Sequence, residues 1–159
     1  MESYKCLIIG GGLAGGRAVD GIRQVDPQGS VALVTQEPHL PYERPPLSKE
    51  YLRGEVDLDR VYVDAADTYA DRRVDVLTGV RATGVNPHGR TVTLDDGRTL
   101  AYEKLLLATG GCAWRLPIPG ADLKNVFTLR TIEDSDAIPR GAGDGAHALV
   151  MGGASSAPR

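Results

Sequence analysis

The sequence predicts an α/β fold that combines a parallel sheet with a small antiparallel β-meander. Within residues 4–35, an apolar strand, a glycine turn, an amphipathic helix and a second apolar strand follow one another, which makes a βαβ unit. Farther along, short apolar runs alternate with turns rich in glycine, asparagine and aspartate, which favours antiparallel strands. The length of 159 residues suits one ordinary domain and the start of a second.

The βαβ unit begins with Tyr4–Ile9, a continuous apolar run that predicts a strand buried on both faces. The following helix, Leu13–Val25, has small and apolar residues at the spacing of one helix face, and Pro27 and Gly29 end it. Val31–Thr35 is the second strand. Parallel strands joined in this way are expected to be connected by a right-handed crossover.

The middle of the chain predicts mostly short elements. A proline-rich loop over 38–46 precedes a short helix at Leu47–Leu52, because prolines are favoured at the first turn of a helix. Alanines, a tyrosine and charges over Asp64–Arg72 predict a surface helix, and Val74–Leu77 is a strand. The meander is expected over Val80–Val85, Arg90–Leu94 and Arg98–Ala101, followed by a separate buried strand, Leu105–Ala108.

The remaining residues predict a linker and the first strand of a second unit. Arg115–Gly120 is punctuated by prolines, and Val126–Ile138 indicates a change from strand to helix. Ala146–Met151 is a fresh apolar strand that ends in two glycines, as a second nucleotide-binding unit would begin. We therefore expect one domain over residues 1–114, a linker over 115–145 and a truncated second domain over 146–159.

Composition excludes several classes of function. With 18 basic and 21 acidic residues, the chain lacks the basic excess that nucleic-acid binding needs. No apolar run reaches membrane-spanning length and no leader opens the chain, so we expect a cytoplasmic protein without a membrane partner. Cys6 and Cys112 form no C-x-x-C pair, which argues against a redox-active dithiol. The histidines His39, His88 and His147 have no metal-ligand spacing.

The glycine turn points to a bound dinucleotide. Gly10 permits a tight turn, Gly12 leaves room for a pyrophosphate, and Gly15 lets the helix pack closely on the strand. The helix N-terminus would present free N–H groups to the phosphates. An acidic residue after the second strand usually binds the ribose; here Glu37 is the first candidate and Gln36 its competitor. The alternative is a purely structural glycine turn followed by a polar loop.

A longer motif narrows the dinucleotide to FAD. Residues 41–52 read PYERPPLSKEYL and resemble the P-Y-x-R-P-x-L-S-K signature of FAD-dependent pyridine-nucleotide oxidoreductases, most closely those that supply electrons to ferredoxins. The resemblance also covers residues 10–15, 105–110, 116–120 and 129–134, in the family's order. It therefore implies an FAD-binding domain of Rossmann type, built in three layers.

The resemblance implies a role for each matching position. Arg44 and Lys49 would face the flavin, where a cation stabilises the reduced ring, although both also suit a solvated loop. Ala82 would meet the adenine through its backbone. Arg130 would reach the flavin side, or else pair with Glu133 or Asp134. The pyrophosphate would be held by Gly10, Gly12, Ala14 and Gly15, and Thr109 and Gly110 would close over the cofactor.

The implied activity is electron transfer from NAD(P)H through FAD to a ferredoxin-like iron–sulfur protein, as in the reductase component of an oxygenase system. No catalytic side chain is assigned. Family members are more than twice as long, so the competing hypothesis is a non-catalytic flavin-binding fragment or gene remnant. A relative of NADH-peroxide or nitrite reductases is a third, weaker reading.

The last six residues break the pattern of a nucleotide-binding turn. A serine codon of the form TCN, read one base earlier, always encodes an apolar residue. If Ser155 and Ser156 have such codons, restoring one base would replace them by two apolar residues, which a nucleotide-binding turn has at these positions. We hypothesise that residues 154–159 are out of frame after a one-base deletion in the preceding glycine codons.

Overall fold

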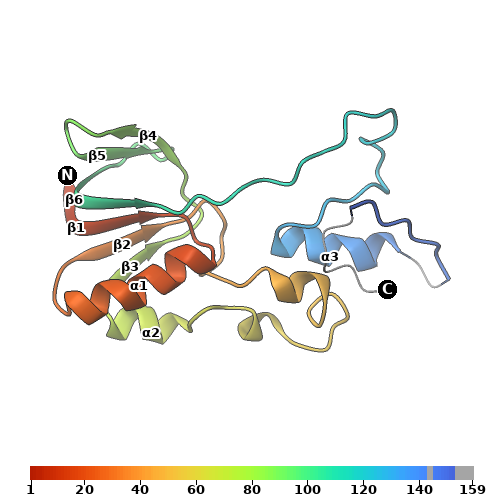
Figure 1. Ribbon diagram of the computed structural model, residues 1–159, viewed down its shortest axis with the longest axis horizontal. Coiled ribbons are helices and arrows are strands. Elements are labelled where there is room, and N and C mark those ends of the chain that lie inside the picture. The colour runs from red at the N-terminus through yellow and green to blue at the C-terminus, as the bar shows by residue number, and fades with distance from the viewer. Residues whose placement is uncertain (143–144, 153–159) are drawn as a thin grey trace.

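The protein forms one six-stranded sheet with helices on one face, as the computed structural model shows for residues 1–142 and 145–152 (Figure 1). The strands lie in the order β3-β2-β1-β6-β5-β4. The first three and β6 run parallel, while β4, β5 and the start of β6 are antiparallel. The predicted α/β class with a parallel sheet and a small meander is confirmed.

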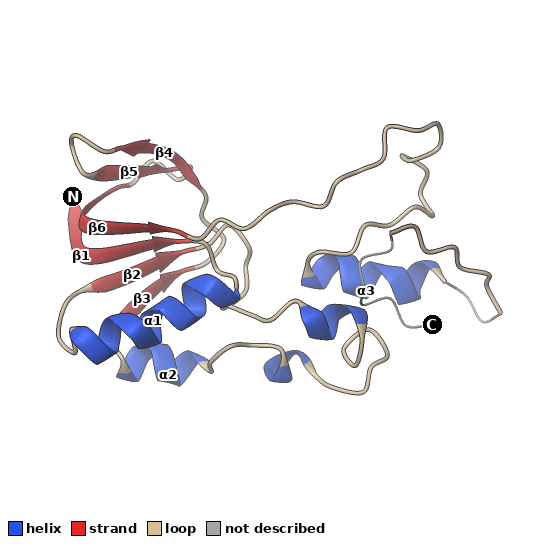
Figure 2. Ribbon diagram, viewed as in Figure 1, coloured by secondary structure: helices blue, strands red, loops and turns tan. Residues whose placement is uncertain are grey.

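The βαβ unit is present where the sequence places it. β1 (Glu2–Ile9) pairs in parallel with β2 (Val31–Val34), and β2 pairs with β3 (Val74–Leu77). α1 (Leu13–Val25) and α2 (Ala66–Asp71) cover one face of this sheet, as Figure 2 shows. The core between them is formed by Ile8, Val19, Val31, Leu33, Tyr69 and Val74.

The other face of the parallel strands is covered by the meander, which makes the third layer. β4 (Ala82–Asn86) pairs with β5 (Thr91–Leu94), and a bulge lies between Ala82 and Gly84. Side chains from β5 pack against the strands across this face, and burial of apolar surface stabilises the layer by about 25 cal/mol per Å². This second core contains Tyr4, Leu7, Ile9, Ala32, Val34, Val92, Leu94 and Leu100.

The prediction that the last meander strand, Arg98–Ala101, and the following strand, Leu105–Ala108, are separate is wrong. Residues 99–107 form one strand, β6 (Thr99–Leu107), which pairs with β1 along its length. Only its first three residues also pair with β5. The polar Glu103 and Lys104 interrupt the apolar pattern but not the backbone hydrogen bonds, since pairing is decided by the neighbouring strand. Leu106 and Leu107 are exposed, so this end of the strand is not buried as expected.

The segment between β2 and α2 contains two short 3₁₀ helices, η1 (Pro45–Ser48) and η2 (Leu58–Arg60), instead of the helix expected at residues 47–52. Later in the chain comes α3 (Ile132–Gly141), which packs against η1. The Ser135 hydroxyl donates to the Leu47 carbonyl at 2.9 Å, and the Tyr51 hydroxyl donates to Asp136 at 2.9 Å. Part of the expected linker is therefore docked on the first domain through Tyr42, Leu47, Val61 and Ile132.

Two further strand predictions are wrong within the described residues. The stretch before α3, from residue 126 on, contains no strand, and neither do residues 145–152. Leu149 and Val150 are 87% and 80% exposed, because no neighbouring strand pairs with this segment in the described chain. The expectation for residues 154–159 lies outside the described residues. None of the helices described here is long and apolar enough to span a membrane.

The surface helix is shorter and better anchored than its sequence suggests. α2 ends at Asp71, and Tyr69 is only 2% exposed. Arg72, expected on an exposed helix, contacts Asp20 at 2.6 Å and Asp64 at 3.1 Å. Arg23 of α1 donates to four backbone carbonyls, those of Asp26, Gly29, Arg72 and Arg73, and so ties the end of α1 to the end of α2.

Candidate dinucleotide site

The glycine turn lies at the carboxyl ends of β1 and β6. Gly10 has φ +125°, and a Cβ there would lie 2.1 Å from the Ala108 carbonyl oxygen, so only glycine fits. A Cβ on Gly15 would lie 1.9 Å from the Gly10 oxygen, which keeps α1 close to the turn. In contrast, no described atom lies within 4 Å of a Cβ built on Gly12. The backbone is therefore open to a ligand at Gly12.

The start of α1 is uncapped. Gly12 is the N-cap and offers no side-chain oxygen, and the first turn carries no acidic residue. Leu13 and Ala14 are exposed at this end. Unpaired amide groups and the positive end of the helix dipole favour an anion here, so the arrangement fits the phosphates of a dinucleotide.

A second glycine-containing segment lies next to the first turn, since a Cβ built on Gly10 would lie 3.1 Å from the Thr109 nitrogen. Thr109 and Gly110 follow β6 and are exposed, and Gly110 has φ +66°. The Nε of Arg130 donates to the Gly111 carbonyl at 2.9 Å, and its Nη2 would lie 3.4 Å from a Cβ on Gly110. The described ion pairs include none between Arg130 and Glu133 or Asp134. Asp134 instead accepts from the backbone N–H of Arg130 at 2.8 Å.

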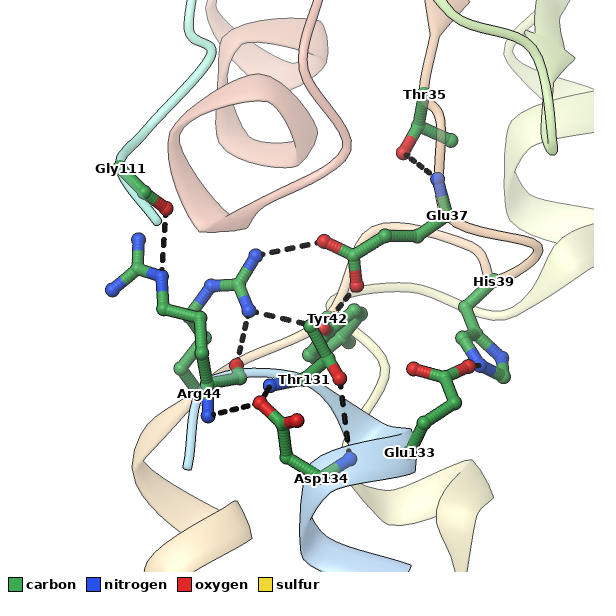
Figure 3. A network of polar contacts seen from close by, with 10 residues as sticks. Thr35, Glu37, His39, Tyr42, Arg44, Gly111, Thr131, Glu133 and Asp134 are labelled. Atoms are coloured by element: carbon green, nitrogen blue, oxygen red, sulfur yellow. Dashed lines mark hydrogen bonds and ion pairs between the residues drawn. The ribbon is translucent and has the colours of Figure 1, made fainter. Parts of the chain in front are cut away.

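The end of β2 carries a polar network, which Figure 3 shows. The Glu37 carboxylate accepts hydrogen bonds from the Tyr42 hydroxyl and, at 2.9 Å, from Arg44. Burial, followed by the hydrogen bond to Glu37, raises the pKa of Tyr42 well above its usual range, so the phenol stays protonated. Arg44 also donates to the Tyr42 oxygen and to the Arg130 carbonyl. Gln36 is exposed beside this network.

Tyr42 also connects the network to the glycine turn. Its backbone bridges to Gly12 on one side and to Tyr62 on the other. A Cβ on Gly16 would lie 3.0 Å from Pro41, so the proline-rich segment packs directly on the first turns of α1. The structure thus brings together the glycine turn, the Glu37–Arg44 network and Arg130, which are far apart in the sequence.

Two predicted site residues lie apart from these contacts. Lys49 follows η1 and is exposed, and in the described residues its ammonium makes no hydrogen bond or ion pair with the others. Ala82 is the half-buried first residue of β4 and pairs with Leu94. The neighbouring Val80 donates its N–H to the Thr35 carbonyl at 3.0 Å, which holds this segment near the end of β2.

Sequence reasoning missed the residues that hold α3 in place. His39 and Glu133 are joined by a 2.6 Å contact between Nε2 and Oε1. Burial acts to raise the pKa of Glu133, but hydrogen bonds from its own backbone N–H, from His39 and from Thr131 lower it overall. Thr131 and Asp134 form a capping box, which the T-x-x-D spacing could have revealed. The His39 contact carries no local signal, because 94 positions separate the partners.

We found no comparable group of residues elsewhere on the surface of the described chain. A shallow concavity of about 720 Å³ lies at the amino ends of β1 and β3, lined in part by Glu2, Tyr4, Asp75 and Arg98. Ligands of open parallel sheets bind at the carboxyl ends instead. Among residues 1–142 and 145–152, no three acidic, histidine or cysteine side chains are grouped as metal ligands. Cys6 and Cys112 are both free thiols.

The strand–glycine turn–helix unit, with its open backbone at the carboxyl edge of a parallel sheet, defines a dinucleotide-binding domain of Rossmann type. Residues 4–157 match the family described as pyridine nucleotide-disulphide oxidoreductase. The chain belongs to this family, whose members are FAD-dependent and use NAD(P)H.

Individual relatives agree with this assignment. The chain is 41% identical over 138 residues to the ferredoxin reductase subunit of the 5,5'-dehydrodivanillate O-demethylase of Sphingobium sp., which covers 87% of this chain and 34% of that protein. It is 36% identical over 150 residues to the putidaredoxin reductase of Pseudomonas putida, covering 92% and 36%.

Solved structures support the same family assignment. The reductase of the covalent putidaredoxin reductase–putidaredoxin complex superimposes with a TM-score of 0.81 at 36% identity, covering 91% of this chain and 36% of that one. The ferredoxin reductase for the CYP199A2 system of Rhodopseudomonas palustris gives a TM-score of 0.80 at 33% identity, covering 88% and 34%. The chain thus spans about a third of the length of the relatives that it matches.

Proposed function

We propose that this chain binds FAD and forms the flavin-binding part of an NAD(P)H-dependent reductase that passes electrons to a ferredoxin-like iron–sulfur protein. The observation that carries the proposal is the open backbone at Gly12, which is the N-cap of a helix without a side-chain cap, in a turn whose first glycine, Gly10, contacts Ala108 and Thr109. The relatives that are named as ferredoxin reductases support this electron acceptor. A cytoplasmic location is part of the same proposal.

The proposal keeps the roles toward FAD that the family resemblance implies for each group. The amides after Gly12 bind the pyrophosphate, and Thr109 with Gly110 closes over the cofactor from the end of β6. The Ala82 backbone meets the adenine. Lys49 and Arg130 supply positive charge on the flavin side, which stabilises the reduced ring. Bound FAD supplies the hydride and single-electron chemistry.

The contacts favour Gln36 over Glu37 for the ribose. Both Glu37 oxygens already accept hydrogen bonds from Tyr42 and Arg44, whereas the Gln36 side chain is exposed at the end of β2. A carboxylate forms stronger hydrogen bonds than an amide. We therefore expect Gln36→Glu to tighten FAD binding about threefold to tenfold, measured by flavin fluorescence, without tightening FMN binding. Unchanged FAD affinity would assign the ribose elsewhere.

Binding itself is tested by a change that fills the open space. Gly12 has extended backbone (φ −92°, ψ −175°), which valine also adopts, and a Cβ there meets no described atom. Gly12→Val should keep the melting temperature of the FAD-free chain but weaken FAD binding on the order of tenfold or more. Gly21→Ala, also in open space, is the matched control. Equal affinity of both variants would refute the proposed site.

A flavin-binding module without turnover is the second candidate. The observation that favours it is that residues 145–152 form no strand of a second nucleotide-binding unit. The two candidates differ when NADH is added to the FAD-loaded chain without oxygen. Bleaching of the flavin absorbance supports the reductase, and an unchanged spectrum supports the module.

A further inference from the structure

Arg44 lies where three segments of the chain meet. Its Nη2 donates to Glu37 at the end of β2, and its Nη1 donates to the Tyr42 hydroxyl oxygen at 3.1 Å and to the carbonyl oxygen of Arg130 (Figure 3). The guanidinium carbon also lies 5.1 Å from the centre of the Tyr42 ring. Its side chain is 29% exposed, and that of Glu37 is 20% exposed.

The chemistry of this junction requires a guanidinium. Arginine presents donors on a rigid planar fork, so one side chain reaches a carboxylate, a phenol oxygen and a carbonyl together. Lysine carries its donors on a single nitrogen, which cannot occupy both ends of the fork. The protonated Tyr42 hydroxyl accepts from Arg44 and donates to Glu37, and so completes the junction.

The junction fixes the backbone of Arg130 from one side. The Asp134 carboxylate holds the same residue from the other side, because it accepts a hydrogen bond from the backbone N–H of Arg130 at 2.8 Å. With both backbone groups held, the side chain of Arg130 extends to the Gly110–Gly111 turn and donates to Gly111 at 2.9 Å. The 86 positions between Arg44 and Arg130 make this contact a clamp between two distant segments.

We propose that Arg44 is a positioning residue that acts through Arg130: it holds the Arg130 carbonyl so that the Arg130 guanidinium lies against the Gly110 turn at the edge of the dinucleotide site. This role differs from direct contact with the flavin, which the sequence motif implies for Arg44. The ligand part of the inference rests on the proposed FAD site, whereas the clamp on α3 stands without any ligand.

The experiment is a double-mutant cycle with two readouts. Wild type, Arg44→Lys, Arg130→Ala and the double variant are titrated with FAD by flavin fluorescence. Hydrogen exchange of the α3 amides is measured on the FAD-free chain. Arg53→Lys is the matched control, because Arg53 makes an exposed ion pair with Glu55 in the same segment and touches neither α3 nor the glycine turn in the described contacts.

Arg44→Lys should raise the dissociation constant of FAD about tenfold in the wild-type background. In the Arg130→Ala background the positioned side chain is absent, so Arg44→Lys should raise the dissociation constant of FAD less than about twofold. The same change should accelerate exchange at the start of α3 about tenfold, and Arg53→Lys should change neither readout.

The outcomes separate the clamp from the proposed function. Additive losses of FAD affinity would show that Arg44 acts on the cofactor without Arg130 and would overturn the inference. Unchanged α3 exchange in Arg44→Lys would overturn it as well. If the wild-type chain binds no FAD, the proposed function is wrong, and so is the role of Arg44 at the dinucleotide site. The hydrogen-exchange data would then test only the contact between Arg44 and the Arg130 carbonyl.

Discussion

The hydroxyl of Tyr69 is buried without a hydrogen-bond partner, and its removal should stabilise the protein. Tyr69 is 2% exposed beneath α1, and its oxygen is the buried side-chain atom without a partner in the described part of the chain. An unsatisfied buried polar group costs about 1–3 kcal/mol. Tyr69→Phe should therefore raise the free energy of unfolding by about 1–3 kcal/mol, which is about 2–4 °C in melting temperature per kcal/mol for a chain of this size.

The effect should grow at high pH. Burial, followed by the charge of Asp64, raises the pKa of Tyr69 to about 12 from its ordinary value of 10.0. Above pH 10 the unfolded chain loses a proton that the folded chain keeps, so the stability that this tyrosine contributes falls as pH rises. The loss is about 1.4 kcal/mol at pH 11, and phenylalanine removes it. The advantage of Tyr69→Phe should therefore be larger at pH 11 than at pH 7.

Thermal and urea unfolding of the FAD-free chain measure both effects, and Tyr51→Phe is the matched control. The same atom is deleted there, but the Tyr51 hydroxyl donates to Asp136 at 2.9 Å, so that variant should lose about 0.5–3 kcal/mol. A loss at Tyr69 as large as that at Tyr51 would refute the reasoning, since it would mean that the Tyr69 hydroxyl has a partner such as an ordered water.

Three further predictions follow from single sites. Gly15→Ala should abolish FAD binding and lower the melting temperature, because the new Cβ would lie 1.9 Å from the Gly10 oxygen. Gly21→Ala in the same helix has open space, so it should raise the free energy of unfolding, measured in urea titrations, by about 1 kcal/mol. Arg23→Met leaves four carbonyls without their donor and should destabilise by about 2–4 kcal/mol in calorimetry; a change below 0.5 kcal/mol would contradict that role. Leu107→Lys, at the 60% exposed end of β6, should reduce light scattering on concentration, and unchanged scattering would place association elsewhere.

Local patterns predicted the parallel half of the fold accurately. The bounds of α1 and β3 agree with those expected, because the glycine turn, the apolar spacing and the proline after the helix all act within a few residues. Turn residues likewise revealed the hairpin between β4 and β5. The order β3-β2-β1 agrees with the usual βαβ arrangement, in which a crossover places each strand beside the previous one, whereas the pairing of β6 with β1 does not follow from this rule.

Features that depend on distant partners were not predictable. β6 is one strand because β1 pairs with it through Glu103 and Lys104, which read as an interruption in the sequence. The stretch before α3 and residues 145–152 have apolar sequences but no partner strand in the described chain. At the candidate site, the motif identified Arg44 but not its contact with the Arg130 carbonyl, because no pattern within residues 41–52 indicates what lies opposite the guanidinium.

The double pairing of β6 makes the two halves of the sheet interdependent. Leu100 and Ala101 are paired with β5 on one side and with β1 on the other, so unfolding of β6 at these residues breaks both pairings at once. Opening should therefore be all-or-none for these strands, with their amides sharing a single free energy of exchange. For protein engineering, an insertion at the hairpin tip over residues 87–89 leaves both pairings in place, whereas a new terminus in the turn over residues 95–97 cuts the direct connection between β5 and β6.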